Sequence, residues 1–168
     1  MHRYKIFNAP MQTTAAIAKV ATGTVIKTML QLATPSTRQC QLISWGYSCD
    51  DLPGADSTIE LIQTDIAATV TAHVASGVQP LDPNAPPSLL TLGTGATGYT
   101  ASVEGAAAAV RTFDAHTLGI GAGETDLKYV YQWMPDERPI IAVSRFLRVR
   151  VTTPTTGTDM LCWVVIDE

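Results

Sequence analysis

Phe146-Leu147-Arg148-Val149-Arg150-Val151 alternates apolar and charged residues with a period of two. That is the period of a β-strand, whose successive side chains point to opposite faces of a sheet. We therefore expect Leu147, Val149 and Val151 to face a core, and Arg148 and Arg150 to face solvent. The stretch predicts a strand with one buried face, as is typical of antiparallel sheets.

Similar strand-like stretches recur along the chain, separated by segments with turn chemistry. The predicted strands are Thr24–Leu32, Cys40–Cys49, Thr58–Thr64, Leu89–Leu92, Ala106–Phe113, Leu127–Met134, Arg145–Thr153 and Met160–Ile166. Eight strands at hairpin and crossover spacing predict an all-β fold. The expected architecture is an antiparallel two-sheet β-sandwich of the jelly-roll type.

One domain is predicted, a β-sandwich at residues 24–168, preceded by an extended N-terminal arm at residues 1–23. Tyr4, Ile6 and Phe7 are large apolar residues on a short segment that Asn8-Ala9-Pro10 then breaks. Three such residues argue for docking, either onto the body of the same chain or onto a neighbour. Tyr4, Ile6 and Phe7 are therefore candidate partner-binding residues.

The composition limits the classes of partner. Of the 168 residues, 46% are hydrophobic but only 15% are charged, below the globular norm of about 25%. A surface so poor in charge suits a protein that partners cover. The net charge is −4 and no Lys or Arg cluster exists, so no nucleic-acid partner is expected. No stretch approaches the ~20 apolar residues that span a bilayer, so no membrane partner is expected either.

Cysteines and loops give further expectations. Cys40, Cys49 and Cys162 match neither a zinc spacing nor an even disulfide framework. Cys49 and Cys162 lie in apolar strand patterns and should be buried, which indicates synthesis in a reducing cytoplasm. Four prolines between Pro80 and Pro87 predict a stiff loop, and long ordered loops often carry an interaction.

No pattern in the chain predicts catalysis. Gly93–Gly98 matches G-x-G-x-x-G, but the residues that follow do not favour a helix, so a turn between strands is the better account. The histidines, His2, His73 and His116, match no metal spacing, although a contact between Asp114 and His116 is possible. A nucleophile elbow is absent. We therefore expect no catalytic residue, no cofactor and no metal, and a protein that is not an enzyme.

Three aromatic residues form a row. Tyr129, Tyr131 and Trp133 share one face of their predicted strand, and Val130 lies on the other. Such a row usually packs in a core. The alternatives are a platform that stacks on a glycan and a surface buried between subunits of a trimer.

Several phrases of the sequence resemble small virion proteins encoded in the structural operons of tailed phages of actinobacteria. They are Tyr4-Lys5-Ile6-Phe7-Asn8-Ala9, Thr22-Gly23-Thr24-Val25-Ile26-Lys27-Thr28-Met29-Leu30-Gln31-Leu32-Ala33-Thr34-Pro35, Trp45-Gly46, Glu60-Leu61-Ile62, Asp82-Pro83-Asn84-Ala85-Pro86, Gln132-Trp133 and the stretch Phe146–Val151. The resemblance spans nearly the whole chain, but it contains no short motif that assigns binding residues.

The resemblance implies a capsid decoration (cement) protein or a related minor capsid component. Such a protein is made in the host cytoplasm and sits on the outside of an icosahedral virion, commonly as a homotrimer. Its partners would be the major capsid protein and copies of itself. Two other hypotheses remain: a glycan- or receptor-binding module of a head or tail fibre, and an enzyme built on a β-sandwich.

Overall fold

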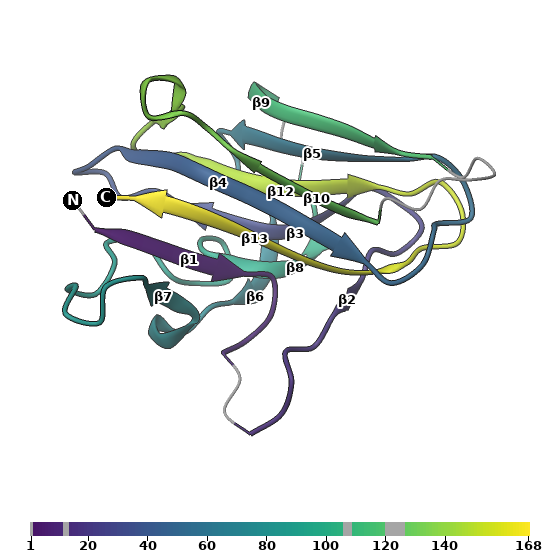
Figure 1. Ribbon diagram of the computed structural model, residues 1–168, viewed down its shortest axis with the longest axis horizontal. Coiled ribbons are helices and arrows are strands. Elements are labelled where there is room, and N and C mark those ends of the chain that lie inside the picture. Colours follow the sequence, from purple (N-terminus) through teal and green to yellow (C-terminus); the bar gives the residue numbers. More distant parts are fainter. Residues whose placement is uncertain (1, 12–13, 106–108, 120–126) are drawn as a thin grey trace.

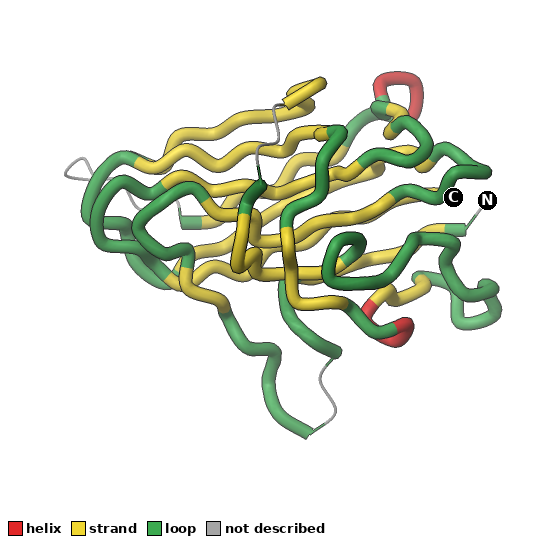
Figure 2. The backbone as a smooth tube through the Cα atoms, turned by 180° about the vertical axis from the view of Figure 1, so that it is seen from behind, coloured by secondary structure: helices red, strands yellow, loops and turns green. Residues whose placement is uncertain are grey.

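The computed structural model describes residues 2–11, 14–105, 109–119 and 127–168. Two antiparallel sheets pack face to face, and the helical structure among these residues is limited to two short 3₁₀ turns (Figures 1 and 2). The predicted all-β two-sheet sandwich is therefore confirmed.

Sheet A holds the first and last strands of the chain side by side. Its strand order is β10-β4-β13-β1-β7, and two short strands, β2 and β11, pair with β13 and β4 outside this order. The strands are β1 (Arg3–Phe7), β2 (Val20–Ala21), β4 (Cys40–Cys49), β7 (Val78–Pro80), β10 (Lys128–Gln132), β11 (Ile140–Ile141) and β13 (Asp159–Asp167).

Sheet B has the strand order β6-β8-β3-β12-β5-β9. Its strands are β3 (Lys27–Ala33), β5 (Ser57–Thr64), β6 (Thr69–Ala72), β8 (Gly98–Val103), β9 (Ala109–Leu118) and β12 (Phe146–Thr152). The two 3₁₀ turns are η1 (Ala75–Gly77) and η2 (Pro135–Glu137). The chain crosses between the sheets at each step from β3 to β4 to β5, and again from β9 through β10 and β12 to β13.

Apolar side chains from the two sheets meet in one core. Trp45 and Tyr47 of β4 enter it from sheet A, and Leu147, Val149 and Val151 of β12 enter it from sheet B. All five are almost fully buried. The inward face predicted for β12 is therefore confirmed.

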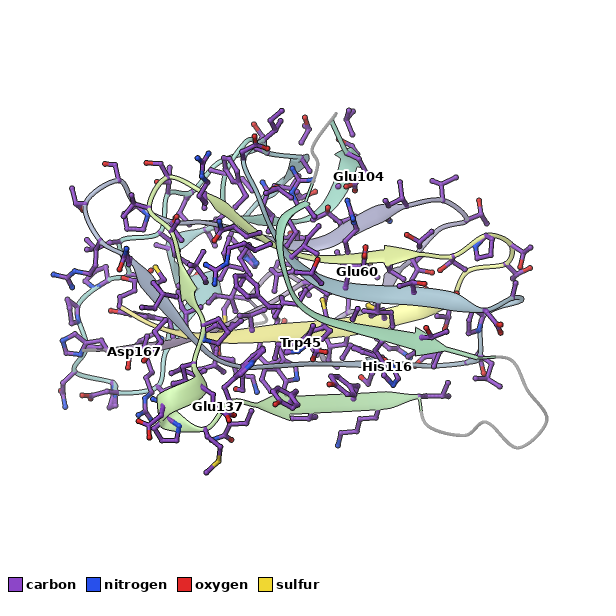
Figure 3. All side chains as sticks on the ribbon, turned by 90° about the horizontal axis from the view of Figure 1, so that it is seen from above. Trp45, Glu60, Glu104, His116, Glu137 and Asp167 are labelled. Carbon is purple, nitrogen blue, oxygen red and sulfur yellow. The ribbon has the colours of Figure 1, made fainter. Side chains whose placement is uncertain are left out.

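The outward face predicted for β12 is wrong for Arg148, which is only 1% exposed. A second layer covers it, because residues after β5 and after β8 lie over the outer face of sheet B. The guanidinium donates to the carbonyl oxygens of Ile66 and Glu104 and lies 3.5 Å from Glu104 Oε2. Figure 3 places Glu104 on the outer side of sheet B, away from Trp45 in the core. Arg150 is half-buried and pairs with Glu60.

The first residues of the chain belong to the sandwich and not to an arm. β1 lies between β13 and β7 and pairs with both. Asn8 continues the attachment, because its side chain donates to Met160 O and accepts from Cys162 N. The boundary predicted at residue 23 therefore coincides with no break in the fold. Among the described residues, parts of the connection from β1 to β2 extend away from the body (Figures 1 and 2).

Candidate functional site

The predicted arm residues have different environments. Tyr4 and Ile6 point into the core of their own chain and are almost completely buried, so neither is available to a partner. Phe7 is half-buried on the outer face of sheet A, where Lys5 Nζ lies 4.9 Å from its ring and 4.3 Å from the ring of Trp163. The partner-binding role predicted for Tyr4 and Ile6 is therefore corrected. The apolar residues predicted docking but could not say whether their own chain or a neighbour would cover them.

The aromatic row on β10 does not form a continuous exposed platform. Trp133, just after β10, is 7% exposed and belongs to the core, and Tyr129 packs against the core. Tyr131 remains 40% exposed, and its ring contacts Trp133 edge to face at 5.0 Å. One exposed ring is a much smaller stacking surface for a sugar than the predicted row of three.

Tyr129 joins a polar aromatic cluster that links the edges of the two sheets. The cluster comprises Trp45 and Tyr47 on β4, Asp114 and His116 on β9, and Tyr129 on β10. Trp45 Nε1 and Tyr129 OH both donate to Asp114 Oδ2, at 2.9 Å and 2.8 Å. Tyr47 OH contacts His116 Nδ1, and the His116 ring stacks on Tyr129 at 4.7 Å. Figure 3 shows Trp45 and His116 close together between the strands.

The contacts in this cluster favour a structural role. Burial and the hydrogen bond to Asp114 raise the pKa of Tyr129 to about 12, so its hydroxyl stays a donor at neutral pH. Asp114 accepts hydrogen bonds from Trp45 and Tyr129 rather than pairing with His116, which contacts Tyr47 instead. Each polar group thus holds a neighbour in place, and β9 is fixed to β4 and β10 across the open side of the sandwich.

Exposed apolar residues lie along this edge of sheet A, with Val130 and Tyr131 on opposite faces of β10. We call Val130, Tyr131, Met134 and Ile140 the edge surface. Val130 is 53% exposed, Met134 67% and Ile140 48%. They are carried by β10, by the start of η2 and by β11, and both strands pair with β4. The sequence placed Val130 opposite the aromatic row, but alternation alone could not show that its face is uncovered.

A second apolar surface lies at the opposite end of sheet A, beside β7. It is a groove of about 560 Å³, lined chiefly by Met11, Val78, Leu90, Leu92 and several prolines of the 80–87 loop. The loop is held in place, because Tyr4 OH donates to Pro86 O at 2.7 Å and Leu89 N donates to Glu168 Oε2 at 2.8 Å. Of its lining residues, Met11 and Leu92 leave much of their apolar side chains exposed. We call this site the β7 groove.

The remaining sequence motifs have structural positions. All three cysteines are reduced and buried, and burial raises the pKa values of the Cys40 and Cys49 thiols to about 12. Residues 93–97 form a turn that leads into β8, so the Gly-rich motif precedes a strand and not a helix. Among the described residues, no three His, Cys, Asp or Glu side chains gather as a metal site would require.

Comparisons with other proteins do not assign this chain to a family. No family model, no curated protein and no solved structure matches it. Within the part of the chain that the structure describes, no helix is both long enough and apolar enough to cross a membrane.

Proposed function

We propose that this chain is a structural virion protein that binds the outer surface of an icosahedral phage capsid and stabilises it as a homotrimer. One observation carries the proposal beyond the sequence resemblance. Sheet A presents exposed apolar side chains at both of its ends, the edge surface at β10 and the β7 groove. Large exposed apolar areas mark interaction sites. A molecule with two such areas at opposite ends is suited to contact two neighbours, as a lattice component must.

The β7 groove is the proposed contact with the major capsid protein. It replaces the mechanism based on Tyr4 and Ile6, which are buried within the chain. Each apolar side chain that becomes fully buried contributes about 1.5–3 kcal/mol before ordering costs are subtracted. Contacts repeated in the three subunits of a trimer act together, so a weak single contact becomes tight binding. A protein that binds only the assembled lattice stabilises that lattice by mass action.

The strand order supports the jelly-roll type as the finer description of the fold. Two sets of four strands, β10-β4-β13-β1 and β9-β5-β12-β3, lie in opposite sheets, and crossings from one sheet to the other recur along the chain. That arrangement is expected of a rolled-up double Greek key. Five further strands, β2, β6, β7, β8 and β11, extend the two sheets. The burial of Trp133 makes a glycan-binding module the weaker alternative.

The direct test is the copy number of the protein in purified virions, measured by quantitative mass spectrometry against the major capsid protein. We expect about one copy per capsid subunit or a simple fraction of that number. A handful of copies would indicate a tail or vertex module, and absence from virions would remove the proposed role.

A binding assay tests the groove itself. Met11→Glu places a charge in the β7 groove, and we expect it to reduce co-sedimentation with shells that lack the protein. Val103→Glu, at an exposed position on β8, is the matched control. Equal binding of both variants would exclude the groove as the capsid contact.

A further inference from the structure

The described residues form four sheet edges, and three of them are poor templates for another strand. β7 has three residues and ends in Pro80. β6 and β9 both contain register shifts against their neighbours, two in each pair. Bulges and prolines are features that prevent edge-to-edge pairing. β10 has neither, because its five residues pair with β4 in one unbroken register.

The backbone of β10 offers hydrogen bonds on its outer side. Leu127 O accepts from Cys49 N and Trp133 N donates to Ile43 O, so the odd-numbered residues bond to β4. In an antiparallel ladder the residues between them point their N–H and C=O groups the other way. Val130 and Gln132 therefore present donors and acceptors away from the sheet. Both side chains are exposed.

We infer that β10 pairs antiparallel with β10 of a second copy, about a two-fold axis at Val130. In this register Val130 faces Val130 of the second copy, and Tyr129 faces Tyr131. Lys128 faces Gln132, so no like charges meet. The two-fold also brings the acidic turn η2, with Asp136 and Glu137, toward the end of β10 that carries Lys128 of the second copy. Figure 3 shows Glu137 beyond the C-terminal end of β10, which begins at Lys128.

A two-fold strand pair would make one continuous sheet from two copies of sheet A. It places Val130 opposite its own equivalent and Tyr131 opposite Tyr129 of the second copy, so both copies contribute the same strand, as in an isologous interface. The inference does not depend on the virion role. If the chain does form trimers on a shell, this contact joins neighbouring trimers and not the subunits within one.

Disulfide trapping tests the register. Opposed residues in an antiparallel pair lie about 5.5 Å apart, within disulfide range. The native thiols are buried with raised pKa values and will not compete. Under mild oxidation of the full chain we expect Val130→Cys to give at least tenfold more covalent dimer than Val103→Cys, an equally exposed control. Equal yields would overturn the inference.

A mixed experiment tests the axis independently. Lys128→Cys and Gln132→Cys should cross-link efficiently when mixed, because these positions face each other, and each should cross-link poorly alone. Efficient cross-linking of either variant with itself would overturn the proposed axis. A Val130→Cys protein that stays monomeric, with β10 paired to an extended peptide of another protein instead, would also overturn the inference.

Val130→Pro separates pairing from folding. The N–H of residue 130 points away from β4, so proline removes the donor used in the proposed contact and leaves the sheet ladder intact. We expect sedimentation velocity to show that Val130→Pro no longer forms dimers, and we expect its melting temperature to stay close to that of the wild type. Tyr131→Pro, which removes an N–H directed at β4, should instead lower the melting temperature. Dimers that persist in Val130→Pro would overturn the inference. Neither readout depends on the copy number in virions.

Discussion

Glu104→Gln should destabilise the sandwich far more than its position at the outer side of sheet B suggests. The carboxylate of Glu104 accepts from Thr28 N and from Thr28 Oγ1, the latter at 2.7 Å, and pairs with Arg148. Burial lowers the pKa of the Arg148 guanidinium, and the charge of Glu104 opposes that shift. Glutamine is nearly isosteric, but it removes the charge and turns one acceptor into a donor among groups that are already donors.

The expected magnitude follows from the burial of Arg148. Breaking a buried ion pair by removing one partner costs about 3–5 kcal/mol, because the remaining charge stays desolvated. Glu104 itself is 20% exposed and two backbone carbonyls still accept from Arg148, so the lower value of about 3 kcal/mol applies. For a domain of this size, that loss lowers the melting temperature by roughly 6–12 °C.

Glu60→Gln is the matched control. Glu60 Oε2 lies 3.0 Å from Arg150 NH2 on the same sheet, but Arg150 remains partly exposed. An exposed pair contributes at most about 1 kcal/mol. Urea unfolding of both variants, with an unchanged m-value, measures the difference. If Glu104→Gln is no less stable than Glu60→Gln, the covering of Arg148 does not matter energetically and the reasoning fails.

Three other outcomes are expected. Ile6→Ala should cost about 2–5 kcal/mol because Ile6 fills the core, whereas Phe7→Ala should cost about 1 kcal/mol; similar values in urea unfolding would contradict the placement of β1. Gly98→Ala places a Cβ too close to a backbone carbonyl oxygen of β6 and should lower the free energy of unfolding by roughly 2–3 kcal/mol. In the control Gly95→Ala, the new Cβ meets no atom within 4 Å. Equal melting temperatures of the two variants would argue against the close approach at Gly98. Burial raises the pKa of the Cys40 thiol to about 12, so above pH 9 the unfolded chain loses a proton that the native chain keeps. The free energy of unfolding should then fall by about 1.4 kcal/mol per pH unit. Cys40→Ala should show a shallower fall in urea unfolding between roughly pH 9 and 11, and an unchanged slope would refute the burial of this thiol.

Alternation along single strands predicted much of the core correctly. The inward face of β12 follows directly from the apolar positions, because a sheet with one covered face requires them. The same reasoning failed at Arg148, since the period of two says which face a residue is on and not what covers that face. The covering residues, Ile66 and Glu104, lie 82 and 44 positions away in the sequence.

The candidate surfaces show the same limit. Tyr4 and Ile6 were recognised as apolar anchors, but their partners on β13 lie at the other end of the sequence. The row on β10 has the predicted parity, and its members still differ in exposure because the strand lies at an edge. The segments that became β6, β7 and β8 carry weak strand patterns, since they are short and interrupted by Gly and Pro.

The position of β13 has a consequence for how the protein folds during synthesis. β13 lies between β4 and β1, and it is the last strand that the structure describes. Sheet A therefore cannot close until residues 159–167 have left the ribosome, and until then β1 and β4 lack the strand that pairs with both. Pairings between such distant segments form slowly, and unpaired strands are prone to aggregate in the meantime. We expect a truncation before residue 159 to be recovered in the insoluble fraction.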